Sequence, residues 1–275
     1  MTGFTRERDE AVRLARAAGA ILMTIYATDF AVSYKGHDDP VTDADKRANE
    51  FIVAGLRTAF PGDGVVAEES ADNSDALKKG RVWYVDPLDG THEFIAKNGE
   101  FAVMIGLAVD GQARVGAVYR PAGDVLFAGI ADQEAWVEEQ GARRPLRAST
   151  RAELPSLRLV MSRSHRHPLT DAIRARLGAG KEMTLGSVGL KTGLIAMQQA
   201  DLYLDLSGFT KAWDSCGPEA ILRGAGGRLT DLAGTALQYG GKELRNRRGL
   251  AASNGACHDR IIETIASIAG DAKLI

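Results

Sequence analysis

The chain has few of the features that place a protein outside the cell or in a membrane. Only two of its 275 residues are cysteines, Cys216 and Cys257, which excludes a disulfide scaffold and favours a reducing compartment. Residues 1–10 are polar and charged, without the apolar core of a secretory signal. No apolar run approaches the roughly 20 residues that span a bilayer. We therefore expect a cytoplasmic protein with no membrane span.

An excess of one charge is also missing. The 34 Lys and Arg residues nearly balance the 36 Asp and Glu residues, and the signs are mixed along the chain. Nucleic-acid binders usually carry a basic patch, and none is evident, so we expect no nucleic acid polymer as a partner. Hydrophobic residues make up 45% of the chain. That content and the length suggest a sizeable core in one large domain or two lobes.

The first part of the chain has the pattern of an α+β lobe. Apolar residues recur at three- and four-residue spacing over residues 6–26 and 42–59, which predicts two amphipathic helices. The pair Asp110-Gly111 lies between two apolar runs and is a hairpin signal. We therefore expect both helices on one face of a mainly antiparallel sheet. Its predicted strands are residues 65–67, 82–85, 101–109, 113–119 and 125–130.

A lobe boundary is predicted within residues 142–155, which are richer in Arg, Pro, Ser and Thr. It divides the chain into lobes 1–150 and 151–275. Beyond it strands and helices alternate, which favours an α/β layer arrangement. The predicted strands are residues 157–161, 201–206, 228–230 and 250–252, and the predicted helices are residues 170–177, 188–199, 215–225 and 258–268.

Residues 86–91, Asp-Pro-Leu-Asp-Gly-Thr, are the strongest candidate for a site. Pro87 restricts its own backbone and that of Asp86, so the chain can turn and aim Asp86, the Leu88 carbonyl and Asp89 at one point. Two carboxylates about 4 Å apart repel by roughly 4 kcal/mol at an effective dielectric of about 20, and a divalent cation between them reverses that sign. All-oxygen ligation suits Mg²⁺, Mn²⁺ or Ca²⁺ rather than zinc. The alternative is an ordinary turn, because Asp, Pro and Gly are common turn residues.

Gly90 and Thr91 complete this segment with a possible anion site. Glycine lets the backbone approach a ligand closely. If a helix or tight turn begins here, its free N–H groups would face an anion. Metal ligands directly before an anion site are what hydrolysis of a phosphate ester requires. The segment therefore predicts a phosphomonoesterase that acts on a small-molecule phosphate ester.

Three further acidic segments support this interpretation. Glu68 and Glu69 follow a short apolar strand and can reach a site at the sheet edge. Asp45 has the spacing of a capping box with Thr42, and it could also hold a hydroxyl or water near the metals. Asp214 is expected at a helix N-terminus, from which it could aim a carboxylate oxygen at a metal. Each has a structural alternative, which is a solvated acidic loop for the first and a plain helix start for the others.

With these segments together, the sequence resembles the inositol monophosphatase-like superfamily of lithium-sensitive, magnesium-dependent phosphatases. The matching pieces cover nearly the whole chain in the family's order: residues 41–45, 68–69, 86–91, 213–214 and 226–227. The resemblance implies a layered α-β-α-β-α sandwich of the sugar-phosphatase type, an α+β fold with its active site between the layers. It also implies two or three Mg²⁺ ions, with Mn²⁺ as a substitute and Li⁺ and Ca²⁺ as inhibitors.

The resemblance also assigns roles to individual residues. It implies that Asp45 and Thr91 activate the attacking water, and that the backbone at Gly90 and Thr91 holds the phosphate. The metal ligands that it implies are Glu68, Asp86, the Leu88 carbonyl, Asp89 and Asp214.

Within the superfamily, the chain is similar to the 3′(2′),5′-bisphosphate nucleotidase branch, often called CysQ. The similar segments are residues 92–101, 162–165, 186–191 and 211–219. In nucleotidases these regions contact the adenosine and the second phosphate. The resemblance therefore implies substrate contacts at Ser162, His165, Gly189 and Lys191. The alternatives are a solvated polar loop for the first pair and an ordinary helix start for the second.

Two departures from that branch are visible. CysQ proteins commonly have Lys where His92 stands, which leaves the substrate preference open. The usual Gly before the Glu pair is Ala67, which is still small.

The function implied is hydrolysis of the 3′-phosphate of 3′-phosphoadenosine 5′-phosphate to AMP and phosphate by metal-activated water, in a monomer or homodimer. No Cys or Ser with an adjacent base is apparent, so a covalent phosphoenzyme is not our first choice. An inositol-1-phosphate or fructose-1,6-bisphosphate phosphatase with the same site remains open. So does a non-catalytic nucleotide-binding protein on the same fold. A two-metal nuclease is disfavoured, because binding to a phosphate backbone relies on Lys and Arg.

Overall fold

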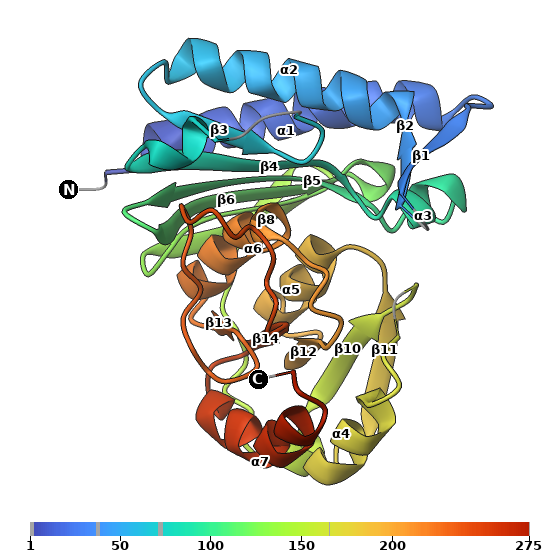
Figure 1. The fold of residues 1–275 in the computed structure, drawn as a ribbon, viewed down its shortest axis with the longest axis vertical. Coiled ribbons are helices and arrows are strands. Elements are labelled where there is room, and N and C mark those ends of the chain that lie inside the picture. Colours follow the sequence, from blue (N-terminus) through green and yellow to red (C-terminus); the bar gives the residue numbers. More distant parts are fainter. Residues whose placement is uncertain (1–2, 37–38, 71–73, 165, 275) are drawn as a thin grey trace.

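The computed structural model describes residues 3–36, 39–70, 74–164 and 166–274. His165, one of the predicted substrate contacts, lies outside these ranges. The chain is arranged in layers, which Figure 1 shows from top to bottom as two helices, a large sheet, two helices, a smaller sheet and two helices. The predicted α-β-α-β-α order is confirmed.

The top layer consists of α1 (Thr5–Tyr26) and α2 (Asp43–Ala59). Each places an apolar stripe on the large sheet, and the stripes and sheet share one core. The predicted capping box begins α2. Thr42 accepts a hydrogen bond from the Ala44 N–H at 3.1 Å, and Asp45 accepts one from the Thr42 N–H at 2.7 Å. These bonds satisfy two N–H groups that a helix start leaves free.

The large sheet has seven strands in the order β3-β4-β5-β6-β7-β8-β9. Only β3 and β4 are parallel, and all other neighbours are antiparallel, so the predicted mainly antiparallel sheet is confirmed. The strands are β3 (Gly64–Ala67), β4 (Arg81–Asp89), β5 (Ala102–Val109), β6 (Gln112–Arg120), β7 (Val125–Ile130), β8 (Glu134–Glu139) and β9 (Ala142–Pro145).

Several short elements were not expected from the sequence. Strands β1 (Val32–Gly36) and β2 (Asp39–Thr42) pair antiparallel before α2, where the sequence predicts a loop over residues 28–40. Strands β8 and β9 extend the large sheet. The other unexpected pieces are η1 (Ala76–Lys78), η2 (Pro121–Gly123) and η3 (Leu154–Ser156). Helix α3 (Thr91–Ile95) begins where the sequence allows for a helix or tight turn.

Strand β4 carries the bulge that the site depends on. Asp86 pairs with Met104, but Asp89 pairs with Ala102, so three steps along β4 match two along β5. The extra residue interrupts the ladder and bends the strand locally. The sequence predicted a turn after Val85. The strand instead continues to Asp89 with this irregularity, which brings both carboxylates to its end.

The middle layer contains α5 (Val188–Ala196) and α6 (Ala212–Gly224). Glycines let α6 lie directly on the large sheet, because a Cβ at Gly116 would lie 2.0 Å from the Gly217 carbonyl oxygen. The predicted start of this helix at Ser215 is wrong. It begins at Ala212, so Asp214 is its third residue rather than its N-cap, and Pro218 lies inside the helix.

The smaller sheet has five strands in the order β11-β10-β12-β14-β13. Strands β11, β10 and β12 are parallel and the other pairs are antiparallel. The predicted alternation of strands and helices is confirmed, although β11 was not expected. The elements are β10 (Arg158–Ser162), α4 (Thr170–Leu177), β11 (Lys181–Leu185), β12 (Leu202–Asp205), β13 (Arg228–Thr230), β14 (Leu250–Ser253) and α7 (His258–Asp271).

The two sheets share the α5–α6 layer. Helix α6 packs against β5 and β6 of one sheet and β13 of the other. The large sheet ends at Pro145 and the smaller one begins at Arg158, but the division into lobes 1–150 and 151–275 stays a prediction.

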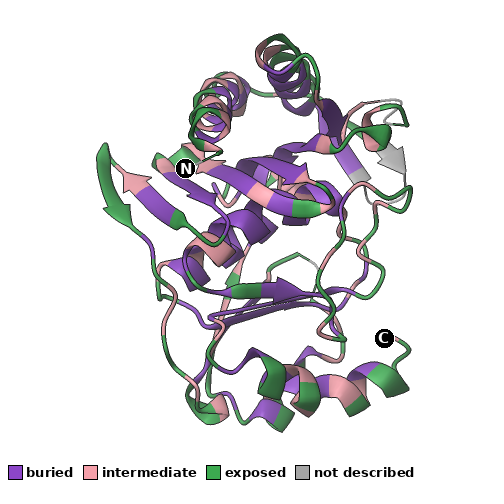
Figure 2. Cartoon of the chain, turned by 90° about the vertical axis from the view of Figure 1, so that its left-hand side faces the viewer, coloured by how far each residue is buried: buried purple, intermediate pink, exposed green. Residues whose placement is uncertain are grey.

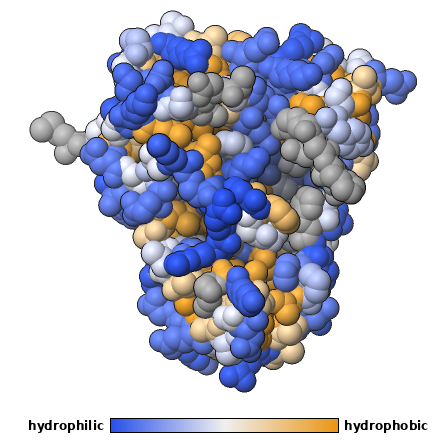
Figure 3. Space-filling model, viewed as in Figure 1, coloured by the Kyte–Doolittle hydropathy of each residue, from blue (hydrophilic) through white to orange (hydrophobic). Residues whose placement is uncertain are grey.

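Figure 2 shows that most strand residues are buried, whereas exposed residues follow the outer sides of the outer helices. On the face seen in Figure 3, hydrophobic residues form small areas broken up by hydrophilic ones. No helix within the described residues has the length and apolar character needed to cross a membrane.

Candidate metal centre and phosphate-ester site

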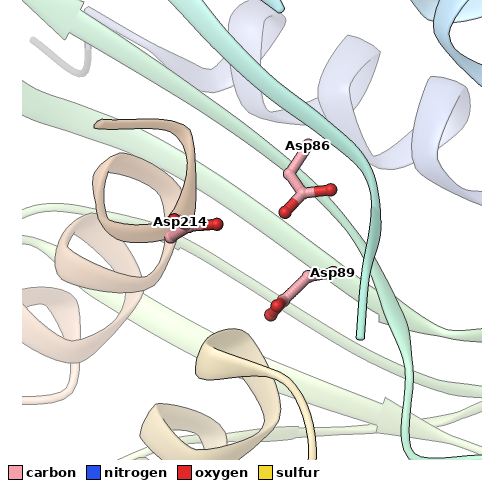
Figure 4. Close-up of side chains that lie close together, drawn as sticks. All are labelled: Asp86, Asp89 and Asp214. Atoms are coloured by element: carbon pink, nitrogen blue, oxygen red, sulfur yellow. The ribbon is translucent and has the colours of Figure 1, made fainter. Parts of the chain in front are cut away.

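Three carboxylates meet between the large sheet and the middle layer. Asp86 and Asp89 come from the bulge of β4, and Asp214 comes from the first turn of α6. Each offers one oxygen, and these oxygens all lie within 4.8 Å of one another. Figure 4 shows the three side chains turned toward a common point. The structure thus brings together three of the five ligands that the resemblance implies.

Two backbone N–H groups and one hydroxyl fix the orientation of this cluster. The Leu88 N–H donates to Asp86 Oδ1 at 2.9 Å, inside the bulge. The Lys211 N–H donates to Asp214 Oδ2 at 2.6 Å, as the N3 residue of a helix commonly accepts from the N-cap. Asp89 Oδ2 accepts from the Ser187 hydroxyl at 2.5 Å. Asp86 and Asp214 also share a side-chain hydrogen bond with each other, so these two carboxylates are in direct contact.

The electrostatics of the cluster show that negative charge is in excess. Burial raises the pKa of Asp86 well above its usual value, and the charges of Glu68, Asp89 and Asp214 raise it further. Burial, with Asp89 and Glu68, raises the pKa of Asp214 to about 8. Burial also raises the pKa of Asp89, although Lys191 opposes the change. Buried like charges of this kind are stabilised by a cation between them.

Glu68 and Leu88 complete the predicted ligand set. Glu68 follows β3, and its N–H donates to the Val85 carbonyl at 3.1 Å, which places it beside the bulge. Both residues line a cavity of about 570 Å³ that also contains the three aspartates. Carboxylate and carbonyl oxygens are the donors preferred by hard divalent cations. The residues present therefore fit Mg²⁺ or a similar ion.

Asp45 and Thr91, the predicted catalytic pair, are in contact. Asp45 Oδ2 accepts from both the N–H and the hydroxyl of Thr42, each at 2.7 Å. Its Oδ1 lies 3.3 Å from Thr91 Oγ1, which is also 3.3 Å from the Leu88 carbonyl oxygen. Burial raises the pKa of Asp45, opposed by the hydrogen bonds from Thr42. The pair links the start of α2 to the β4 bulge.

Gly90 occupies a conformation that requires glycine. Its φ is +98°, in the left-handed region, and it is the N-cap of α3. A Cβ there would lie 3.1 Å from the Glu100 carbonyl oxygen. Gly90, which has only backbone atoms, and Thr91 both line the cavity.

The predicted substrate contacts differ in their position. Ser162 and Lys191 line the cavity, whereas Gly189 is not among its lining residues. The Gly189 N–H instead donates to Asp89 Oδ2 at 3.2 Å. A Cβ at this position would lie 2.6 Å from Met104 Sδ, so the glycine lets α5 approach the sheet.

Lys191 is a buried cation in this cavity. It is 2% exposed, and its Nζ lies 3.4 Å from the Leu185 carbonyl oxygen and 5.0 Å from the centroid of the Tyr203 ring. Burial lowers the pKa of Lys191, and the charge of Asp89 opposes that change. Lys191 is therefore the positive group that balances part of the aspartate cluster.

Ser187 is a site residue that sequence reasoning missed. Its hydroxyl donates to Asp89 and accepts from the Leu190 N–H at 3.2 Å, so it caps α5 and orients a predicted metal ligand at once. A serine directly before an apolar helix is a recognisable N-cap signal. That signal predicts the cap, but not the contact with Asp89.

A second missed group forms another part of the cavity wall. Phe209, Thr210, Lys211 and Arg245 all line the cavity. Arg245 lies in residues 231–249, which form neither a helix nor a strand apart from an isolated bridge. Hydrophobic periodicity predicts helices and strands, so it could not have placed Arg245 in the site.

The chain resembles known proteins over almost its full length. Residues 5–269 match the model of the inositol monophosphatase family. The 3′(2′),5′-bisphosphate nucleotidase CysQ of Escherichia coli O157:H7 is 38% identical over 238 residues, which cover 86% of this chain and 94% of that protein. Inositol monophosphatase 3 of Solanum lycopersicum is 32% identical over 266 residues, which cover 94% and 95%.

Solved structures agree with the fold. The crystal structure of CysQ from Bacteroides thetaiotaomicron, a bacterial member of the inositol monophosphatase family, aligns with a TM-score of 0.76 and 28% identity. The alignment covers 91% of this chain and 98% of that one. The resemblance seen in the sequence is confirmed, and the carboxylate cluster agrees with it. The chain belongs to the inositol monophosphatase family, whose members are metal-dependent phosphomonoesterases.

Proposed function

We propose that this chain is a Mg²⁺-dependent 3′(2′),5′-bisphosphate nucleotidase that hydrolyses the 3′-phosphate of 3′-phosphoadenosine 5′-phosphate to AMP and phosphate. The observation that carries the reaction type is the meeting of Asp86, Asp89 and Asp214 in a cavity beside the Asp45–Thr91 pair. The observation that supports the substrate is the 38% identity to a CysQ protein with that activity in its name.

The metal would be held by oxygen atoms alone. The residues placed to hold it are Glu68, Asp86, the Leu88 carbonyl, Asp89 and Asp214. When bound, Mg²⁺ supplies polarisation of the phosphoryl group, a lowered pKa for water and charge stabilisation of the leaving oxygen. The three aspartates meet in one cluster, so a single ion can contact all of them.

Asp45 and Thr91 would position the attacking water. The Thr91 hydroxyl donates to Asp45 Oδ1, which leaves the lone pairs of Thr91 Oγ1 to accept a hydrogen bond from water. As the water oxygen attacks phosphorus, its proton passes to Thr91 Oγ1, and the Thr91 proton passes to Asp45. The leaving 3′-oxygen then takes a proton from solvent. Asp45 must be ionised to accept its proton, and the bonds from Thr42 keep its other oxygen fixed.

The reacting phosphate would lie over the start of α3. The exposed backbone at Gly90 and Thr91 offers N–H donors, and Ser162 and Lys191 line the same cavity. The positive charge of the buried Lys191 lowers the pKa of Asp89, against the effect of burial. Its charge would balance the phosphate once the metal has neutralised the aspartates.

The test is release of phosphate from 3′-phosphoadenosine 5′-phosphate with and without Mg²⁺. We expect Mg²⁺-dependent turnover that falls at least about 100-fold in Asp89→Asn, because one ligand charge is lost. Asp75→Asn is the matched control, since Asp75 is exposed and pairs only with Lys78 at 2.7 Å among the described contacts. Activity of Asp89→Asn near that of Asp75→Asn would contradict the assignment.

A second candidate is an inositol monophosphate phosphatase with the same site, which the 32% identity to inositol monophosphatase 3 supports. Fructose-1,6-bisphosphate is the third substrate to include. A panel of the three esters, compared by kcat/KM with and without Li⁺, separates these activities. We also propose that Mn²⁺ can replace Mg²⁺ and that Li⁺ and Ca²⁺ inhibit the enzyme. We propose a cytoplasmic protein that is a monomer or a homodimer. Light scattering after gel filtration measures which of these two oligomeric states is present.

A further inference from the structure

Glu100 and Arg163 form an ion pair that connects the two sheets beside the cavity. Glu100 lies between α3 and β5 of the large sheet, and Arg163 directly follows β10 of the smaller sheet. The guanidinium of Arg163 donates to both carboxylate oxygens of Glu100, each at 2.6 Å, and to the Thr184 carbonyl of β11 at 3.2 Å. Two parallel bonds between the same pair of groups fix direction as well as distance.

The Glu100 side chain of this pair is largely buried, with 15% of its surface exposed. Burial alone would raise the pKa of Glu100, but the hydrogen bonds from Arg163 and from the Gly186 N–H outweigh it, so the pKa is lowered. Glu100 is therefore charged at neutral pH. A charged carboxylate accepts stronger hydrogen bonds than a neutral one.

Glu100 also holds the turn that precedes α5. Its Oε2 accepts a hydrogen bond from the Gly186 N–H at 2.8 Å. The two main chains lie so close that a Cβ at Gly186 would be 2.5 Å from the Glu100 carbonyl oxygen. Only glycine permits this approach, so Glu100 contacts the turn with both its side chain and its backbone.

Ser187, the next residue of this turn, has a backbone conformation that side-chain-bearing residues rarely adopt. Its φ is +55°, and such a conformation persists only where the surroundings determine it. In this conformation the Ser187 hydroxyl donates to Asp89 Oδ2 at 2.5 Å, and the Gly189 N–H donates to the same oxygen at 3.2 Å. The turn that Glu100 holds is thus the turn that orients Asp89.

We propose that Glu100, fixed by Arg163, is a positioning residue of the metal centre, which holds Ser187 so that Asp89 faces the cation. Neither Glu100 nor Arg163 is among the residues that line the cavity, so their effect on a bound metal passes through Ser187. Groups that hold a metal ligand in place change metal affinity by about 10- to 100-fold when they are removed. This inference rests on the proposed function, in which Asp89 binds Mg²⁺.

The experiment measures the Kd of Mg²⁺ by calorimetry in the wild type, Glu100→Ala and Glu100→Gln. Glu182→Ala is the matched control. The Glu182 side chain is also 15% exposed and pairs with an arginine, Arg166, at 2.5 Å, but Glu182 does not line the cavity. Loss of an equally buried ion pair is therefore common to both alanine variants, and only Glu100→Ala affects the turn before α5.

We expect the Kd of Mg²⁺ to rise about tenfold or more in Glu100→Ala and to stay within about twofold of wild type in Glu182→Ala. Glu100→Gln should lie between them, because its amide oxygen can still accept from the Gly186 N–H. Arg163→Gln removes the other half of the pair and should also weaken Mg²⁺ binding, which keeps the test available if Glu100→Ala does not fold. Equal Kd values in the Glu100 variants, Arg163→Gln and Glu182→Ala overturn the inference.

A double-mutant cycle tests whether Glu100 acts through Ser187. Ser187→Ala should weaken Mg²⁺ binding by itself. The variant that carries both Glu100→Ala and Ser187→Ala should then have a Kd within about twofold of that of Ser187→Ala, because changes along one route do not add. Factors that multiply in the double variant would show that Glu100 does not act through Ser187, and would reject the proposed route.

Phosphate release from 3′-phosphoadenosine 5′-phosphate separates this inference from the proposed function. Mg²⁺ binding without phosphate release in the wild type would refute the proposed function, and the comparison of Kd values would still decide the role of Glu100. Turnover in the wild type with an unchanged Kd in Glu100→Ala would refute the role of Glu100 alone. A wild type that does not bind Mg²⁺ would overturn both.

Discussion

Asp45 Oδ1 lies 3.3 Å from Thr91 Oγ1, and this contact joins residues that are 46 positions apart. It connects the first turn of α2 to the first residue of α3, beside the bulge that holds two aspartates. The other oxygen of Asp45 is already committed to Thr42. The capping carboxylate therefore uses one oxygen for the start of α2 and the other for Thr91, which lines the cavity.

The first prediction concerns this pair. Asp45→Asn and Thr91→Val should each lower kcat by about 100- to 10,000-fold with little change in KM, because a positioned proton acceptor acts mainly in the transition state. Asp43→Asn, an exposed carboxylate in the same helical turn, is the control. An effect confined to KM would show that the pair binds substrate rather than activating water.

The second prediction concerns the pH dependence of the chain without metal. Burial and neighbouring charges raise the pKa of Asp214 to about 8, against about 4 when unfolded. Between these values the folded state binds more protons than the unfolded state, so this group makes stability fall as pH rises from about 4 to 8. Asp214→Asn should therefore raise Tm at pH 8 by a few degrees and change it little at pH 4.

Thermal unfolding at both pH values, in chelator and in Mg²⁺, checks this. Mg²⁺ should raise the Tm of the wild type at pH 8 and have much less effect on Asp214→Asn. A lower Tm for the variant at pH 8 in chelator would contradict the view that the cluster is repulsive without a cation.

The third prediction concerns a buried histidine far from the cavity. His258 is 1% exposed and lies between the hydroxyls of Ser253 and Thr230, each at 2.8 Å. Burial lowers the pKa of His258 to about 4 from 6.5. The unfolded state takes up the proton first as pH falls, so stability should be lost from about pH 6.5 down to 4, by about 3 kcal/mol.

In His258→Asn, the free energy of unfolding should fall less between pH 6.5 and pH 4 than in the wild type, although the variant loses packing at every pH. Urea unfolding at pH 7 and pH 4.5 measures the difference between the two values for each protein. An equally large loss of unfolding free energy in His258→Asn would show that other groups cause the loss of stability in acid.

The fourth prediction concerns the contact of α6 with the large sheet. In Gly116→Ala, the new Cβ would lie 2.0 Å from the Gly217 carbonyl oxygen, so the helix must shift. We expect a loss of about 1–3 kcal/mol in stability and weaker Mg²⁺ binding, since Asp214 moves with α6. Gly180→Ala is the control, because nothing lies within 4 Å of a Cβ there. Lost stability with unchanged Mg²⁺ affinity would separate α6 packing from the metal centre.

The parts of the site that could be predicted from sequence depend on local rules. Asp86 and Asp89 follow an apolar strand beside a proline, and Asp45 has a capping-box spacing with Thr42. Each pattern lies within a few residues, where backbone preferences decide the structure. Only the family resemblance predicted that these residues meet at one site, because local rules do not relate residues that are distant in the sequence.

Two of the missed strands, β9 and β11, lie at the edges of their sheets. Every residue of β9 is exposed, and β11 forms by parallel pairing along its whole length with β10. Both are edge strands, whose formation depends on a neighbour distant in the sequence. Arg245 and Ser187 reach the site for the same reason, because their partners Lys211 and Asp89 come from other parts of the chain.

The meeting of Asp86 and Asp214 has a consequence for synthesis of the chain. Asp214 is supplied only after the large sheet and five further elements, β10, α4, β11, α5 and β12, have been made. A nascent or truncated chain that stops before α6 therefore has an incomplete ligand set, and a bound ion can stabilise only states that possess its ligands. We therefore expect cation affinity to appear only when α6 has packed on the large sheet, with the ion linking that sheet to α6.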